Sequence, residues 1–179
     1  MGLSTLGFNP LRRFPADRIA PTEQDYRFRS QLLQGTVHDQ MAAIQGGVSG
    51  HAGLFGTALD LATVMQMNLW KGEYGGKRYF KSGTVPAFTR MADRGHHRGL
   101  GWDKVPASGN SSYVSDKASE NSFGHTGFTG AVVWADPNEE LVFVFLSNRI
   151  HPDMENRGIS KHRTRRKIHD IIYEALVQS

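Results

Sequence analysis

Residues 122–148 constrain the fold more than any other part of the chain, because they contain two apolar runs joined by a tight turn. The runs, residues 131–135 and 141–146, are rich in Val and Phe, and residues 136–140 (Asp-Pro-Asn-Glu-Glu) separate them. Proline suits a type I turn, and two such runs around a turn predict an antiparallel hairpin. Neither run alternates cleanly between apolar and polar residues. The stretch therefore predicts a sheet covered by helices on both faces.

A glycine-rich segment, residues 124–130 (Gly-His-Thr-Gly-Phe-Thr-Gly), comes directly before this hairpin. Its three glycines allow the backbone to come close to another group. Taken alone, the segment leaves two interpretations open. It is either part of a functional site or a glycine-rich entry to a strand without a chemical role.

A family resemblance favours the functional interpretation. Residues 125–127 (His-Thr-Gly), followed by two apolar strands, resemble the third motif of the serine β-lactamase and penicillin-binding-protein family, which reads Lys-Thr-Gly or His-Thr-Gly. The class C-like branch, which includes esterases and peptidases, fits best. Residues 99–103 look like the family's strand before the motif, and residues 53–61 look like its helix start. The resemblance runs from about Gly46 to the end and matches only the C-terminal part of a full family domain.

The resemblance implies an α/β fold in the broad α+β sense, an antiparallel sheet with packed helices, as a single partial domain over residues 1–179. In a full-length protein it implies hydrolysis or transfer at an ester, amide or β-lactam carbonyl through an acyl-serine. His125 and Thr126 would then contact the substrate. Gly127 would keep a side chain out of the way, and the backbone N–H of Phe128 would be an oxyanion donor. A carbonyl oxygen that gains charge needs two aligned donors, and the second would come from the nucleophilic serine.

The nucleophile of this family lies on a Ser-x-x-Lys motif, which sets both side chains on one face of a helix. No lysine of the chain has a serine three residues before it. The second family motif is matched as Ser-x-Asn at residues 108–110 and 119–121, but both triplets lie just before His125 instead of far upstream. We therefore expect the nucleophile and its base before residue 1 of a longer protein, and the chain alone to be inactive. The alternative is a non-catalytic module that binds peptidoglycan or sugar fragments, or serves in assembly.

Three other patterns are weaker candidates for a site. His96 and His97 lack a carboxylate partner at ligand spacing, so we expect an exposed pair and no metal or cofactor. Residues 47–51 fail as a nucleophile elbow, because His51 stands where the Gly-x-Ser-x-Gly pattern needs glycine. A basic cluster near the C-terminus could bind phosphate or anionic lipid, although a solvated helix face is the better interpretation without interleaved aromatics. The cluster comprises Lys161, Arg163, Arg165, Arg166 and Lys167.

Composition excludes several function classes. The 179 residues suit one domain or a large piece of one, and the absence of cysteine excludes disulfides and thiol chemistry. The net charge of +4 does not by itself indicate nucleic-acid binding. No apolar run approaches the roughly 18 residues of a membrane helix, and no signal peptide is visible. By resemblance, the longer protein would be periplasmic or otherwise extracytoplasmic, with a small-molecule or peptidoglycan-like substrate.

Local patterns predict further elements along the chain. Thr22 with Asp25 suggests a helix start, and residues 35–51 suggest a glycine-rich loop. Thr57 should cap a helix that runs to about Trp70, with Asp60 completing a capping box. We further expect strands at 77–80 and 100–102, a short helix at 82–91, a polar loop at 106–121 and a last helix at 161–177. The apolar face of that helix should be Ile168, Ile171, Ile172, Ala175 and Leu176.

The partial domain also predicts self-association. A full family sheet continues with strands and a helix from the N-terminal region. Their absence should leave part of the hairpin's large side chains uncovered and one strand edge unpaired. A second copy would cover both. The side chains expected to be exposed in this way are Val132, Trp134, Phe143 and Phe145.

Overall fold

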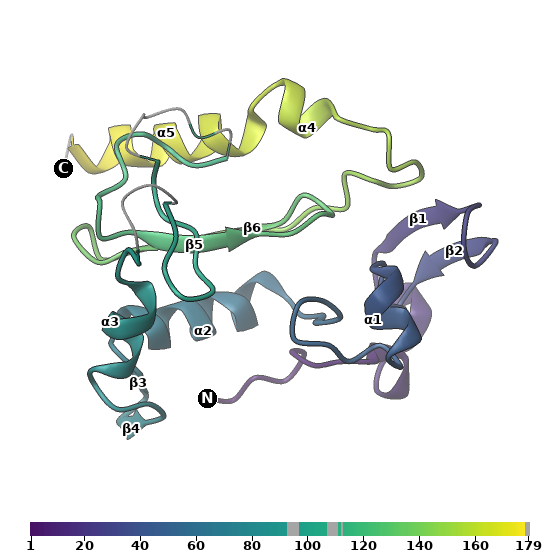
Figure 1. Ribbon diagram of the computed structural model, residues 1–179, viewed down its shortest axis with the longest axis horizontal. Coiled ribbons are helices and arrows are strands. Elements are labelled where there is room, and N and C mark those ends of the chain that lie inside the picture. Colours follow the sequence, from purple (N-terminus) through teal and green to yellow (C-terminus); the bar gives the residue numbers. More distant parts are fainter. Residues whose placement is uncertain (93–96, 107–110, 112, 178–179) are drawn as a thin grey trace.

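The computed structural model describes residues 1–92, 97–106, 111 and 113–177. Its centre is an antiparallel sheet of three strands in the order β5-β6-β7. Helix α2 lies on one face of this sheet, and helix α5, preceded by the short helix α4, lies on the other (Figure 1). These elements are β5 (Phe123–Thr126), β6 (Val132–Asp136), β7 (Leu141–Phe145), α2 (Ala58–Leu69), α4 (Gly158–Lys161) and α5 (Thr164–Val177).

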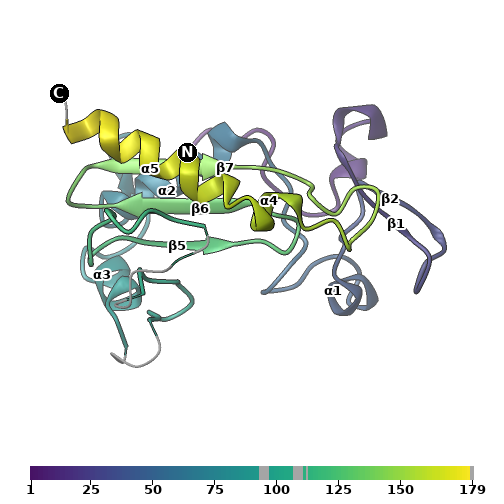
Figure 2. The ribbon, with the colours of Figure 1, turned by 90° about the horizontal axis from the view of Figure 1, so that it is seen from above.

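A second group of elements lies outside these layers. The hairpin β1–β2 and helix α1 sit together beyond one end of the sheet in both ribbon views (Figures 1 and 2). Hairpin β3–β4 and helix α3 follow α2 at the other end. The elements are the 3₁₀ turns Pro10–Arg12 and Ala16–Arg18, β1 (Pro21–Asp25), β2 (Gln31–Gln34), α1 (Gln40–Ile44), β3 (Glu73–Tyr74), β4 (Lys77–Arg78) and α3 (Thr84–Thr89).

Both faces of the sheet are covered, as the hairpin sequence predicted. On one face, Met65 and Leu69 of α2 pack against Phe123 and Ala135. On the other face, Ile168 and Ile172 of α5 pack in the cluster that contains Trp134. The mixed architecture confirms the predicted α+β class.

The prediction that the hairpin's large side chains lie partly uncovered is wrong for three of the four. Val132 and Trp134 are each 1% exposed, and Phe143 is 6% exposed. Val114 and the first turns of α5 cover this face from within the chain, and Phe145 is half-buried beside them. Among the described residues β7 pairs with β6 alone, so the argument from a free strand edge remains. Self-association therefore stays a prediction.

Helix α2 starts where the sequence predicted, but only half of its capping box forms. The Thr57 hydroxyl accepts a hydrogen bond from the backbone N–H of Asp60, at 3.3 Å. The Asp60 carboxylate turns away and accepts from the N–H and the hydroxyl of Thr5, at 2.7 and 2.6 Å, and from the N–H of Leu6, at 3.0 Å. These donors lower the pKa of Asp60. The carboxylate thus ties the start of the chain to the start of α2.

Two predictions in the N-terminal third are wrong for local reasons. Residues 21–25 form strand β1 and not a helix, because the Asp25 carboxylate closes the following turn. It accepts hydrogen bonds from the backbone N–H groups of residues 27–29. Residues 35–51 are not all loop, because Asp39 caps helix α1 by accepting from Ala42 N–H at 2.8 Å. In each case an aspartate starts a structure that composition does not predict.

The C-terminal half needs three corrections. The strand expected at 100–102 is replaced by isolated bridges of Asp103 with Arg98 and Gly124. The last helix is interrupted, because Arg163 has a φ of 50° between α4 and α5. Its inward face differs as well, since Ile171 is 63% exposed. Strand β4 and helix α3 form as predicted, over shorter ranges, whereas the partner strand β3 was not predicted.

Candidate functional site

Strand β5 carries the His-Thr-Gly segment from the core to the surface. Phe123 and Gly124 are buried, whereas His125 is exposed and Thr126 is half-buried. Gly124 lies opposite Trp134 in the register of β5 and β6. A Cβ atom there would lie 2.2 Å from both Trp134 Cε3 and the Val133 carbonyl oxygen. The indole ring therefore requires glycine at this position, and the strand emerges one residue later with His125.

The loop after β5 is a closed turn. The Gly127 N–H donates to the Ala131 carbonyl, and the Gly130 N–H donates to the Gly127 carbonyl, each at 2.9 Å. Gly130 has a φ of 102°, and a Cβ atom there would lie 2.5 Å from Ser147 Oγ. The backbone N–H of Phe128, between these two bonds, donates to no acceptor within the described part of the chain. It is free to donate to a bound group.

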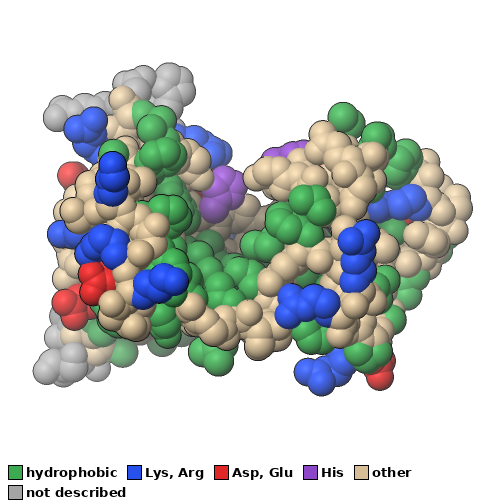
Figure 3. All heavy atoms as spheres, turned by 90° about the horizontal axis from the view of Figure 1, so that it is seen from below, with side chains coloured by type: hydrophobic (Ala, Val, Ile, Leu, Met, Phe, Trp, Pro, Cys, Tyr) green, Lys and Arg blue, Asp and Glu red, His purple; other side chains and the backbone are tan. Residues whose placement is uncertain are grey.

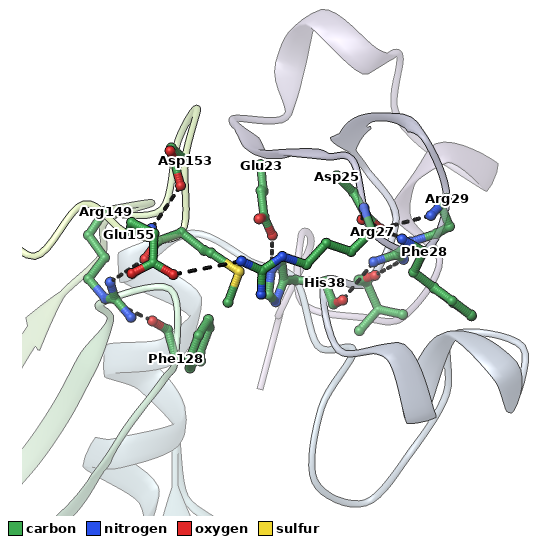
Figure 4. Close-up of polar contacts among 12 residues, drawn as sticks. Glu23, Asp25, Arg27, Phe28, Arg29, His38, Phe128, Arg149, Asp153 and Glu155 are labelled. Atoms are coloured by element: carbon green, nitrogen blue, oxygen red, sulfur yellow. Dashed lines mark hydrogen bonds and ion pairs between the residues drawn. The ribbon is translucent and has the colours of Figure 1, made fainter.

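Phe128 is held from two sides. The residue is 57% exposed, and its ring stacks on the imidazole of His38, with centroids 5.4 Å apart. The guanidinium carbon of Arg149 lies 5.0 Å from the centroid of the same ring, and Arg149 Nε donates to the Phe128 carbonyl at 3.1 Å. His38 in turn contacts the Glu23 carboxylate of β1 (Figure 4). The Phe128 ring thus connects the β1–α1 segment to the loop after β5, and Asn148 Nδ2 adds a hydrogen bond to the Pro21 carbonyl at 2.8 Å.

His125 Nδ1 bonds to the backbone carbonyl of Thr126, at 2.8 Å. A carbonyl oxygen only accepts, so Nδ1 carries the proton, and in the neutral ring Nε2 has a free lone pair. The four predicted site residues, His125, Thr126, Gly127 and Phe128, line one cavity of about 940 Å³. Its volume lies in the range of small-molecule sites. Their catalytic roles stay predictions.

The same cavity has a second wall, built from residues 37–41 and 51–57. Figure 3 shows the hollow between two parts of the molecule, with apolar side chains on its floor and histidines on both sides. Arg18 also lines it. Among the described residues, four basic side chains line the cavity, against one carboxylate, that of Asp39. The basic side chains are Arg18, His38, His51 and His125.

A chain of hydrogen-bonded polar side chains links two residues of the second wall, His51 and Asp39, to Ser49, which is not among the lining residues. Ser49 Oγ lies 2.8 Å from His51 Nδ1, and His51 Nε2 lies 2.9 Å from Asp39 Oδ1. Hydrogen bonds from the Ala42 N–H and the His51 ring lower the pKa of Asp39. Sequence reasoning missed this arrangement. Its only local signal was a serine two residues before a histidine in a glycine-rich segment.

The Ser-x-Asn triplet at 119–121 has a structural role. The Ser119 N–H and hydroxyl donate to the buried Asp136 carboxylate, at 2.8 and 2.5 Å. Burial raises the pKa of Asp136, but these donors and the Tyr173 hydroxyl outweigh it, and the net pKa is lowered. Asn121 bonds to Asn138. The triplet thus fixes the β6–β7 turn, and the triplet at 108–110 lies outside the described residues.

The basic cluster does not form one solvated face. Arg165 is buried and donates to the Gly130 carbonyl, at 3.3 Å. Arg166 pairs with Asp116 at 2.5 Å and with Asp170 at 3.5 Å. Two of the five cations thus serve contacts within the protein. Of the histidine pair considered as metal ligands, His96 lies outside the described residues, and no group of three or more metal-ligating side chains occurs among those described.

Three comparisons with known proteins bear on this arrangement. The Beta-lactamase family model matches residues 7–164. A Salmonella gallinarum protein with the provisional name D-alanyl-D-alanine carboxypeptidase is 39% identical over 175 residues, which cover 89% of this chain and 40% of that protein. A Salmonella typhi protein of the same name is 38% identical with the same coverage. A solved structure from Bacillus anthracis, provisionally named a 6-aminohexanoate-dimer hydrolase, has a TM-score of 0.44 and 23% identity, over 69% of this chain and 31% of that one.

The chain thus spans about 40% of the length of the Salmonella relatives that it matches. No helix in the described part of the chain is both long enough and apolar enough to cross a membrane.

Proposed function

The chain belongs to the β-lactamase family, and from this premise we propose that it forms one side of an acyl-serine hydrolase site in a longer protein. The observation that carries the proposal is the convergence of His125, Thr126, Gly127 and Phe128 on one cavity. The nucleophile and its base would come from the part of the longer protein that this sequence does not include. The relatives, of which the chain spans 40%, are long enough to supply them.

The proposed substrate is a peptide with a C-terminal D-alanyl residue, hydrolysed at its last amide bond. The provisional name of the Salmonella relatives supports this choice. The cavity supports it electrostatically, because its basic side chains, among them Arg18 and His125, suit a substrate that ends in a carboxylate.

In the proposed mechanism, the free N–H of Phe128 donates to the carbonyl oxygen as negative charge develops on it. The closed turn that begins at Gly127 and the clamp from His38 and Arg149 hold that N–H in place before the substrate binds. Pre-organised donors of this kind need no rearrangement at the moment of reaction. The Thr126 hydroxyl would donate to the substrate carboxylate or carbonyl beside it, and His125 Nε2 would do so in the protonated imidazole, where both ring nitrogens donate.

The test is release of D-alanine from a D-alanyl-D-alanine peptide by the longer protein. Thr126→Val and His125→Ala should lower kcat/KM by about 30-fold or more, since each removes a polar contact worth about 2–4 kcal/mol in the transition state. Ser82→Ala, an exposed serine away from the cavity lining, is the matched control. Unchanged kcat/KM in both cavity variants would place the site elsewhere, and substrate binding without turnover would favour a binding module.

A further inference from the structure

The chain of hydrogen bonds from Ser49 through His51 to Asp39 takes no part in the acyl transfer proposed above. Its two distances, 2.8 Å from Ser49 Oγ to His51 Nδ1 and 2.9 Å from His51 Nε2 to Asp39 Oδ1, are both within hydrogen-bonding range. It joins a hydroxyl, an imidazole and a carboxylate in that order. This is the order in which a serine nucleophile, a general base and an orienting acid act together.

The network fixes where the protons lie. An ionised carboxylate only accepts hydrogen bonds, so His51 Nε2 must carry a proton and donate it in the hydrogen bond to Asp39. In the neutral imidazole, Nδ1 then has a lone pair and accepts from the Ser49 hydroxyl. The Ser49 O–H thus points its proton at a base, and the oxygen lone pairs remain for a bond to carbon.

The backbone holds the three groups in place. Asp39 is the N-cap of α1, and its Oδ1 accepts from Ala42 N–H at 2.8 Å as well as from His51. The loop that carries Ser49 and His51 is closed at its base, where Gly53 has a φ of 110°. A Cβ atom on Gly53 would lie 2.5 Å from the Gly47 carbonyl oxygen. Asp39, at one end of the hydrogen-bonded chain, is therefore held by the start of α1, and Ser49, at the other end, by the loop that closes at Gly53.

The three groups are accessible to a substrate. The His51 side chain is 54% exposed and the Asp39 side chain 42% exposed, and both line the cavity. Ser49 is half-buried and is not among the lining residues, but its hydroxyl contacts His51 at the exposed margin of the cavity. Apolar side chains of the same wall, Leu54 and Phe55 among them, also line the cavity. This surface suits a small ester with an apolar acyl group.

We propose that Ser49 is an activated nucleophile, with His51 as its general base and Asp39 as the residue that orients the base, and that it accepts acyl groups from small carboxylic esters. Ser49 Oγ attacks the carbonyl carbon while its proton passes to His51 Nδ1. The bond from carbon to the leaving oxygen then breaks, and the leaving alcohol takes that proton. Water repeats the cycle and releases the acid. The proposal needs no residue outside the printed sequence, and it departs from the expectation that the chain alone is inactive.

The experiment uses the 179-residue chain and a fluorophosphonate probe, which forms an Oγ–P bond and releases fluoride. We expect one label per chain by intact mass, and peptide mapping should place it on Ser49. Ser49→Ala should abolish it, and His51→Gln should slow it by about 100-fold, the usual contribution of a general base. The unmodified chain should also hydrolyse p-nitrophenyl butyrate slowly. The rate should be lower in His51→Gln and absent in Ser49→Ala.

Asp39→Asn is the most informative variant. Asparagine can still cap α1 by accepting from Ala42 N–H. Its amide group can also donate to His51 Nε2, which moves the imidazole proton to Nδ1 and leaves no base for Ser49. Labelling should therefore fall at least 10-fold without loss of helix signal or melting temperature. A variant that merely loosened the loop would lower the melting temperature as well.

Ser82→Ala, which removes an exposed serine elsewhere, should label like the unmodified chain. The proposal is overturned if the folded chain takes no label or if the label lies on another serine. It is also overturned if Ser49 reacts as fast in the His51→Gln and Asp39→Asn variants as in the unmodified chain. Each of these outcomes leaves the function of the longer protein untouched, because that function is tested on D-alanine release through Thr126 and His125.

Discussion

The rings of His38 and Phe128 stack with centroids 5.4 Å apart and an interplanar angle of 17°, although 90 positions separate them in the sequence. This contact connects the β1–α1 segment to the loop that follows β5. The imidazole also contacts Glu23, whose side chain is only 12% exposed. Loss of the imidazole would therefore leave the Glu23 carboxylate without its described partner and the Phe128 ring with Arg149 alone.

We predict that His38→Ala lowers the free energy of unfolding by about 2 kcal/mol, from the lost stack and the uncompensated carboxylate. A double-mutant cycle with Phe128→Leu should give a coupling energy of about 1 kcal/mol, measured by urea unfolding. His38 with Phe88→Leu, an exposed aromatic that makes no ring contact in the described structure, provides the control cycle. A coupling energy near zero for Phe128 would mean that the rings do not interact in solution.

Of the substitutions in β5 that add a single methyl group, Gly124→Ala should lower the stability of the fold most. Its Cβ would meet the Trp134 ring and the Val133 carbonyl at 2.2 Å, and neither can move freely, because Trp134 is 1% exposed. We expect a loss of about 3 kcal/mol or more, typical of overpacking in a tight core. Gly83→Ala, where no atom lies within 4 Å of the added Cβ, is the matched control and should change stability little. Equal melting temperatures for the two variants would contradict the packing described here.

The buried imidazole of His169 predicts acid sensitivity between pH 6.5 and 4. Burial lowers its pKa to about 4, only partly offset by Asp170 and Asp136. Between these two pKa values the His169 side chain is protonated in the unfolded chain, with an ordinary His pKa of about 6.5, but not in the folded chain. Stability should be intact above about pH 6.5 and fall as the pH drops towards 4, by a total on the order of 3 kcal/mol.

The variant that isolates this effect is His169→Asn. The Ser115 N–H donates to His169 Nδ1 at 3.0 Å, and an asparagine oxygen can replace that acceptor. Urea titrations at pH 7, 5.5 and 4.5 should show a smaller loss of stability in the variant. Parallel curves for the two proteins would show that other groups cause the acid sensitivity.

Self-association is predicted to occur through the edge of β7, whose described pairing is with β6 alone. An unpaired edge offers backbone donors and acceptors to another chain. Sedimentation velocity at micromolar concentration should show a dimer, and Val144→Lys should weaken it, because a lysine on an edge strand opposes pairing. Val48→Lys on an exposed loop is the control for added charge. A monomer at all concentrations would show that the edge is protected.

The sequence predicted those elements whose signals are local. The β6–β7 hairpin and the start of α2 at Thr57 depend on residues within a few positions of each other, and both are confirmed. The strand β1 was missed because Thr22 and Asp25 have the spacing of a helix cap, while the Asp25 carboxylate is used by the turn after it. The burial of Trp134 was missed because its cover includes Val114 and Ile172, which no local pattern connects to it.

The candidate site likewise has one part that local sequence signals predict and one part that they do not. His125 and Thr126 belong to a contiguous motif, so the sequence places them on one strand. The wall opposite depends on contacts between residues far apart, such as His38 with Phe128, and no spacing rule indicates them. The bond between His51 and Asp39 spans 12 positions and depends on the turn between α1 and Gly53.

The Oδ1 atom of Asp39 accepts from the first turn of α1 and from the imidazole of His51 at once. The start of the helix and the proposed orientation of the imidazole therefore both depend on a single oxygen atom. Serine or threonine would satisfy the first demand and not supply the carboxylate for the second, and glutamate would place its oxygens one carbon further from the backbone. Few substitutions can be neutral for both demands, so Asp39 should accept far less variation among homologues than its exposure suggests.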